Sequence, residues 1–140
     1  MFKRILLAVD GSKHAERAAK VATEMANCME LSELRIVVAY DPIPPYLGEP
    51  NNQFVINARL DEAQRILQEA VINVGDVRGN IHTEMIEGNP AEAIIEVAKT
   101  HNSDLIILGS RGLGRLAGLV LGSTSQKVVS HAPCPVLIVR

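Results

Sequence analysis

The stretch DLIILGSRG at residues 104–112 is the part of the sequence that decides the fold. Its apolar run, Leu105–Leu108, has the length and aliphatic content of a buried strand. The glycines that follow, Gly109 and Gly112, free backbone N–H groups to surround an anion. After nine further residues, Gly122-Ser123 stands where a helix N-terminus would point at the same anion. The spacing predicts a phosphate-binding loop at the end of a strand.

The distribution of charge agrees with a local anion site. All sixteen acidic residues lie at or before Asp104, and the basic residues after it are Arg111, Arg115, Lys127 and Arg140. The formal net charge of the whole chain is only −2, which argues against a broad basic surface for nucleic acid or membrane. Aromatic residues make up 3% of the chain, too few for base-stacking platforms.

Short apolar runs alternate with longer segments of helical period along the whole chain. The predicted strands are Ile5–Val9, Leu34–Tyr40, Ile81–Ile86, Leu105–Leu108 and Val136–Val139. The predicted helices are Ser12–Met29, Leu60–Val74, a segment opened by Asn89-Pro90, and Ser123–His131. This alternation predicts one α/β domain over residues 1–140, a doubly wound five-stranded parallel sheet of order 3-2-1-4-5 with helices on both faces. The proline-rich segment Asp41–Asn52 is expected to be a long loop.

The expected strand order places a ligand crevice between the first and fourth strands, where the connections diverge. The loops that flank it are Asp10-Gly11-Ser12 and Gly109–Gly122, so topology and glycine spacing point to the same place. Asp10 is either a ligand contact or the organiser of the turn into the first helix, for which Ser12 is a plausible N-cap.

Other residues have ordinary structural explanations. Ser123 and Gln126 fit a capping box at the start of the fourth helix, with Ser123 as N-cap. Cys28 falls on the apolar stripe of the first helix and is expected in the core, whereas Cys134, between two prolines, is expected to be accessible. His131 is expected to interact with the C-terminal end of its helix.

The last strand suggests how the chain would associate. Val136–Val139 contains no polar residue that would guard a sheet edge against pairing, so a homodimer through this strand is expected. The apolar run at the start of the chain is only five residues long and ends at Asp10, which favours a strand over a signal or membrane segment. We therefore expect a cytoplasmic protein without membrane contact.

Four segments together resemble one family. Residues 5–12 (ILLAVDGS), 104–114 (DLIILGSRGLG), 121–125 (LGSTS) and 131–139 (HAPCPVLIV) closely resemble universal stress protein domains. The resemblance spans the chain, and it implies an α/β fold with the strand order above, a cytoplasmic location and a homodimer. It also implies an ATP-binding member, because this type keeps the pattern G-2x-G-9x-G-[S/T], which is complete here.

The resemblance further implies a set of binding residues. Phosphates and ribose would be held at Gly109, Gly112, Gly122, Ser123, Thr124 and Ser125, with Leu108 and Arg111 lining the same site. Asp10 would lie near the ribose and phosphates, and the backbone of Ala39 near the adenine. Mg²⁺ or Mn²⁺ would accompany the ATP.

These observations favour a small ATP-binding regulator whose nucleotide orders the Gly109–Gly122 loop and alters binding of a regulatory protein partner. The sequence offers no clear nucleophile paired with a general base, so no catalytic residue is assigned and any ATP hydrolysis is expected to be slow. Two alternatives remain open at this point: a nucleotide hydrolase or phosphotransferase, and a dimeric interaction module that functions without nucleotide.

Overall fold

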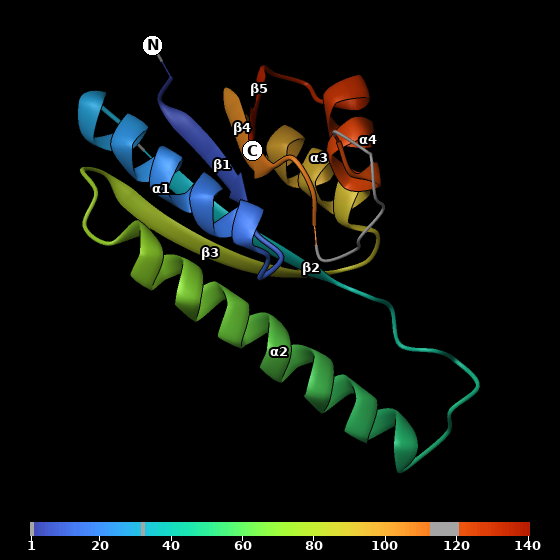
Figure 1. Cartoon of the computed structure of the whole chain (residues 1–140). Helices are drawn as coiled ribbons and strands as arrows, with labels where there is room; N and C mark the ends of the chain where they lie inside the picture. Colours follow the sequence, from blue (N-terminus) through green and yellow to red (C-terminus); the bar gives the residue numbers. More distant parts are fainter. Residues whose placement is uncertain (1, 32, 113–120) are drawn as a thin grey trace.

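The computed structural model of the chain (Figure 1) describes residues 2–31, 33–112 and 121–140, and in them strands and helices alternate. Their bounds are β1 Arg4–Ala8, α1 Lys13–Cys28, β2 Glu33–Tyr40, α2 Asn51–Val74, β3 Asn80–Glu87, α3 Pro90–Thr100, β4 Leu105–Gly109, α4 Ser123–His131 and β5 Val136–Val139. None of the helices in these residues is both long and apolar enough to cross a membrane.

The strands form one parallel sheet in the order β3-β2-β1-β4-β5, which confirms the predicted fold. The register pairs Ile5 of β1 with Leu34 of β2 on one side and with Leu105 of β4 on the other. The connections leave in opposite directions from β1 and β4, so the switch point lies between these two strands.

Helices cover both faces of the sheet (Figure 1). On one face, α1 and α2 pack against a core that includes Leu7 and Ile36. On the other, α3 and α4 pack against a core that includes Leu6 and Ile106. Successive residues of a strand point to opposite faces, so the unbroken apolar run of β1 supplies both cores.

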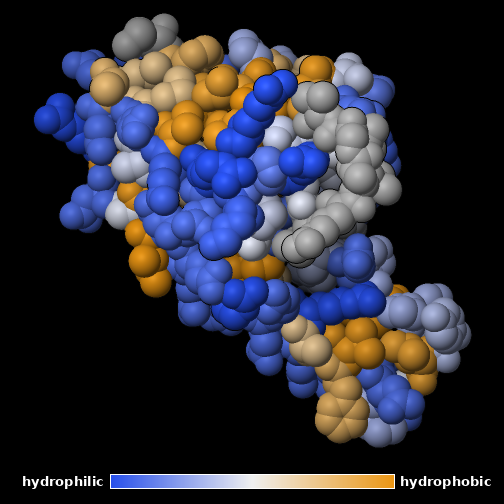
Figure 2. All heavy atoms as spheres, viewed as in Figure 1, coloured by the Kyte–Doolittle hydropathy of each residue, from blue (hydrophilic) through white to orange (hydrophobic). Residues whose placement is uncertain are grey.

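The helix α2 begins at Asn51, nine residues before the predicted start at Leu60. Its buried residues begin only at Ala63, and the preceding turns project from the domain together with the loop 41–50 (Figure 1). Figure 2 shows apolar surface on this projecting end, where Phe54 and the loop residue Tyr46 are exposed. The prediction missed these turns because it relied on an apolar stripe, and a helical segment that packs against no core need not carry one.

Two smaller predictions were wrong. The N-cap of α4 is Gly122 and not Ser123, no side chain caps the helix, and Gln126 Nε2 donates to the carbonyl of Leu121 at 3.3 Å instead of completing a capping box. Cys28 is exposed, because it is the last residue of α1 and lies off the stripe of alanines that faces the core. His131 does contact its helix end as expected, with Nδ1 3.1 Å from the carbonyl oxygen of Lys127.

Candidate functional site

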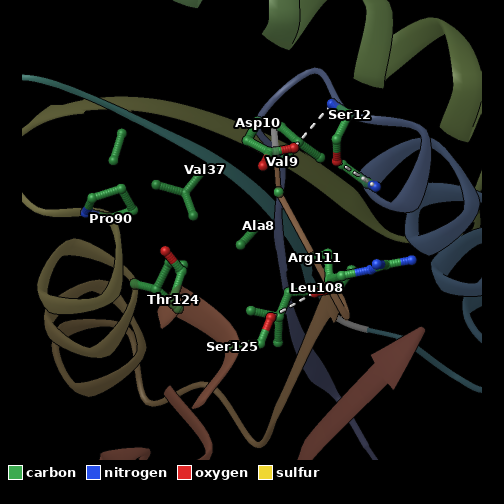
Figure 3. A pocket seen from close by; sticks show the side chains of 15 residues that line it. Ala8, Val9, Asp10, Ser12, Val37, Pro90, Leu108, Arg111, Thr124 and Ser125 are labelled. Atoms are coloured by element: carbon green, nitrogen blue, oxygen red, sulfur yellow. Dashed lines mark hydrogen bonds between the residues drawn. The ribbon is translucent and has the colours of Figure 1, made fainter. Parts of the chain in front are cut away.

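A cavity opens at the carboxyl ends of β1, β2 and β4, at the switch point of the sheet (Figure 3). It is bounded by the turn after β1, the turn after β4 and the first turns of α3 and α4. Its lining residues are Ala8, Val9, Asp10, Ser12, Ala15, Val37, Ala39, Pro90, Ile94, Leu108, Gly109, Arg111, Gly112, Thr124 and Ser125. This is where open α/β sheets bind their ligands.

The two parts of the glycine motif meet beside this cavity although nine residues separate them in the chain. The N–H of Gly122 donates to the carbonyl oxygen of Ser110 at 2.7 Å. A Cβ atom built on Gly122 would lie 3.4 Å from Cα of Arg111, an ordinary contact distance. The turn after β4 therefore packs directly against the start of α4.

The first turn of α4 supplies backbone N–H groups at the cavity that have no acceptor within the helix. The first N–H groups of a helix have no acceptor within it, and no side chain caps α4. Thr124 and Ser125, which belong to this first turn, line the cavity. The hydroxyl of Ser125 is buried and donates to the carbonyl oxygen of Gly109 at 2.8 Å, which ties α4 to the end of β4. Such a helix end favours negative charge.

Asp10 organises the turn into α1, which is one of the two roles considered for it, and it also lines the cavity. Its Oδ1 accepts the N–H of Ser12 at 2.9 Å, and Ser12 in turn caps α1 by accepting the N–H of Ala15 at 3.1 Å. Its Oδ2 lies toward Gly112, where a Cβ atom would come within 2.5 Å of it. The carboxylate thus shapes the turn after β1 (Figure 3) and also lies directly against the glycine turn beside the cavity.

Apolar side chains form the remainder of the cavity wall. Val37 and Ile94 come from β2 and α3, and Pro90 opens α3. The glycine spacing could not identify these residues, because it carries information only on phosphate contacts. The strand order could have found Val37, since β2 lies beside β1 at the switch point.

The structure brings most of the predicted site residues together. Eight of the ten line the cavity: Asp10, Ala39, Leu108, Gly109, Arg111, Gly112, Thr124 and Ser125. The other two, Gly122 and Ser123, lie at the start of α4 without lining the cavity. Arg115 falls outside the described residues.

The sequence analysis missed one pair beside the site. Nδ1 of His14, in the first turn of α1, lies 3.1 Å from Oγ of Ser110. No spacing signals this pair, since its members are 96 residues apart. Within residues 2–31, 33–112 and 121–140, no group of three or more histidine, cysteine or acidic side chains is placed to hold a metal ion.

Comparison with known proteins identifies the family. The model of the universal stress protein family matches residues 1–140. The chain belongs to the universal stress protein family. A Thermus aquaticus protein named universal stress protein in QAH/OAS sulfhydrylase 3′region is 49% identical over 140 residues, which cover all of both chains.

Solved structures agree with this assignment. The universal stress protein UspA from Lactobacillus plantarum has a TM-score of 0.86 at 30% identity, over 99% of this chain and 98% of that one. A universal stress protein in complex with cAMP has a TM-score of 0.74 at 26% identity, over 99% of this chain and 97% of that one. This universal stress protein therefore has the same fold as these two relatives.

Proposed function

We propose that this universal stress protein is a small regulator that binds ATP in the cavity between β1 and β4. The observation that carries the proposal is the junction of the two parts of the glycine motif, where the N–H of Gly122 donates to Ser110 beside the cavity. The relative in complex with cAMP supports an adenine nucleotide as the ligand class.

We assign the phosphates and ribose to the glycine turn and the start of α4. The phosphate contacts are the backbone N–H groups of Gly112 and of the first turn of α4, next to Gly109, Gly122, Ser123 and Ser125. The support for this is electrostatic, because these donors converge where a helix N-terminus carries partial positive charge. Arg111 lines the same cavity, and its guanidinium, which points away from the cavity in Figure 3, would add a charge-assisted contact by turning toward the phosphates.

We assign the adenine ring to the apolar side of the cavity. There the wall consists of Val37 and Ala39 of β2, Leu108 of β4 and Ile94 of α3. Apolar walls hold an aromatic ring, while backbone groups such as those of Ala39 recognise its polar edge. The base would then lie against β2 and the phosphates against β4.

A divalent cation fits the site as a partner of the phosphates. Mg²⁺ is usually held by one or two carboxylates together with substrate phosphates, and Mn²⁺ accepts the same ligands. Oδ2 of Asp10 faces the glycine turn and is the carboxylate that would contribute this ligand. The cation would neutralise charge between the phosphates and Asp10.

We expect hydrolysis of the bound ATP to be slow at most. Fast phosphoryl transfer requires a positioned water or nucleophile as well as charge stabilisation. The Ser110 hydroxyl has histidine beside it, but Ser110 is only 1% exposed and is withdrawn from the cavity. A regulator whose loop is ordered by bound nucleotide, and whose partner binding changes as a result, does not require rapid ATP hydrolysis.

The proposal includes a homodimer through β5 and an unidentified regulatory protein partner. β5 is an edge strand in the described sheet, and its four residues are half-buried. Pairing with a second copy would cover both its backbone edge and these side chains. The cytoplasmic location remains a prediction from the sequence.

The nucleotide content of freshly purified protein tests the function. Denaturation should release ATP or ADP at about one molecule per chain, identified by chromatography and mass. An empty protein that also fails to bind added Mg-ATP would contradict the proposal and favour an interaction module without nucleotide. Rapid turnover by the purified protein would instead favour the hydrolase or phosphotransferase alternative.

A further inference from the structure

The contact between His14 and Ser110 lies just behind the proposed phosphate site. Ser110 is 1% exposed, so its hydroxyl is removed from water and requires a hydrogen-bond partner inside the protein. Nδ1 of His14, at 3.1 Å, is that partner. His14 does not line the cavity, but it contacts two residues at the end of β4: its side chain meets Ser110, and its Cβ and backbone pack against Gly109.

Ser110 forms hydrogen bonds to three different elements. Its side chain reaches α1 through His14, and its N–H donates to the carbonyl oxygen of Val139 in β5 at 2.7 Å. Its own carbonyl oxygen accepts the N–H of Gly122 at 2.7 Å, at the start of α4. The orientation of the two peptide units that meet at Ser110 therefore determines how the turn after β4 meets the helix that would bind phosphate.

The backbones of α1 and β4 approach each other closely at this point. A Cβ atom on Gly109 would lie 2.6 Å from Cβ of His14 and 2.8 Å from its carbonyl carbon. His14 is thus held against the end of β4 by packing as well as by its hydrogen bond. This packing fixes the backbone of α1 beside β4, which keeps the His14 imidazole within reach of the Ser110 hydroxyl.

We infer that His14 is a positioning residue for the phosphate-binding turn: through Ser110 it fixes the peptides of Arg111 and Gly112 before nucleotide arrives. This inference rests on the proposed function, since it concerns the same site. A turn that is already ordered loses less conformational entropy on binding, so the contact increases nucleotide affinity without touching the nucleotide.

The same geometry excludes a Ser–His catalytic pair. A nucleophile must reach the reacting atom, and a candidate base must contact the proton that it removes in a plausible substrate pose. The Ser110 side chain is buried behind the turn and bonded to His14, so no substrate atom in the cavity can approach it.

A double-mutant cycle on ATP affinity tests the inference. The variants are Ser110→Ala, His14→Ala and the double variant, with calorimetric titration of ATP and a thermal melt for each. Loss of one hydrogen bond should weaken ATP binding about fivefold in each single variant. The double variant should bind no more weakly than the single variants do, and His14→Asn, which keeps a hydrogen-bonding group near Nδ1, should recover part of the affinity.

The matched control is His82→Ala, which removes a half-exposed histidine from β3 at the far edge of the sheet. It should leave ATP affinity unchanged. Ser110→Ala removes one oxygen atom only and keeps the test valid if His14→Ala does not fold. Additive losses in the double variant, or unchanged affinity in both single variants, would overturn the inference.

A second measurement separates this inference from the proposed function. Amide hydrogen exchange of Gly122 in nucleotide-free protein reports on its bond to Ser110. Exchange should be faster in Ser110→Ala and His14→Ala than in the wild type and in His82→Ala. Unchanged exchange overturns the positioning role even if the wild type binds ATP. Absence of ATP binding by the wild type overturns the proposed function, while faster Gly122 exchange in the variants would still support positioning of the turn.

Discussion

At the scale of single residues, Gly109 and Gly122 of one motif differ in how much space surrounds them. Gly109 has no space for a side chain, since a Cβ atom would meet the backbone of His14. Gly122 has ordinary contact distances around it and serves as the N-cap of α4. The sequence identified both glycines by their spacing. It could not distinguish their roles, because the close approach of α1 to β4 is a tertiary contact.

Because Gly109 is crowded and Gly122 is not, substitutions at the two positions should affect stability differently. Gly109→Ala should lower the free energy of unfolding by about 1–3 kcal/mol, because the added methyl group must push α1 away from β4. Gly122→Ser, at a position where serine is a favoured N-cap, should change it by less than about 0.5 kcal/mol. Urea denaturation followed by circular dichroism measures both. Equal losses in the two variants would contradict the packing argument.

The two cysteines should differ in reactivity. Burial, reinforced by the negative charge of Asp104, raises the pKa of the Cys134 thiol, so less of it is thiolate at neutral pH. Cys28 is exposed. A disulfide reagent at pH 7.5 should therefore modify Cys28 first, and Cys28→Ser should leave only the slow reaction, which accelerates as the pH rises toward the raised pKa. Faster modification of Cys134 than of Cys28 would contradict the partial burial of Cys134.

At the scale of elements, α2 combines a packed half and a projecting half. The apolar period from Leu60 predicted the part that packs against the sheet, and the structure confirms a helix there. The turns from Asn51 onward lie outside that pattern: Asn51 and Asn52 were predicted as part of the loop, and residues 53–59 were assigned to no element. Burial begins at Ala63, so contacts with the core hold only the later turns in place.

The two halves of α2 should respond differently to truncation of a side chain. Leu67 is 7% exposed and contributes to the core, so Leu67→Ala should cost about 2–5 kcal/mol of unfolding free energy. Phe54 is 70% exposed, so Phe54→Ala should cost less than about 0.5 kcal/mol. Thermal or urea unfolding distinguishes them. A large loss at Phe54 would mean that the projecting half is buried in solution, as in an assembly.

At the scale of the whole molecule, the sequence predicted the fold, and eight of the ten residues that it singled out line one cavity at the switch point. Five aliphatic runs separated by helical segments allow few topologies, and the switch point then follows. The part of the apolar wall that α3 supplies was not predicted, because Pro90 and Ile94 reach the cavity only when α3 packs against the sheet. The His14–Ser110 contact depends on the same kind of long-range packing.

The dimer is tested by blocking the free edge of β5. The carbonyl oxygens of Pro135 and Val139 accept N–H groups from the β4 side, so by the period of two the backbone of Ile138 faces the open edge. Ile138→Pro removes the N–H there and should convert a dimer to a monomer in sedimentation equilibrium. Ile138→Val keeps the N–H and should remain a dimer. A wild-type monomer, or a dimeric Ile138→Pro variant, would contradict association through β5.

The central claim is that ATP binds at the junction of the two glycine segments. Its most direct test is calorimetric titration of Mg-ATP into nucleotide-free wild type and the Gly112→Ala variant. A Cβ atom at position 112 would lie 2.5 Å from Oδ2 of Asp10 and should displace that flexible carboxylate while leaving the fold intact. We predict saturable binding of one ATP per chain by the wild type and at least tenfold weaker binding by the variant, a difference of about 1.4 kcal/mol or more. No binding by the wild type, or equal binding by both proteins, would contradict the account.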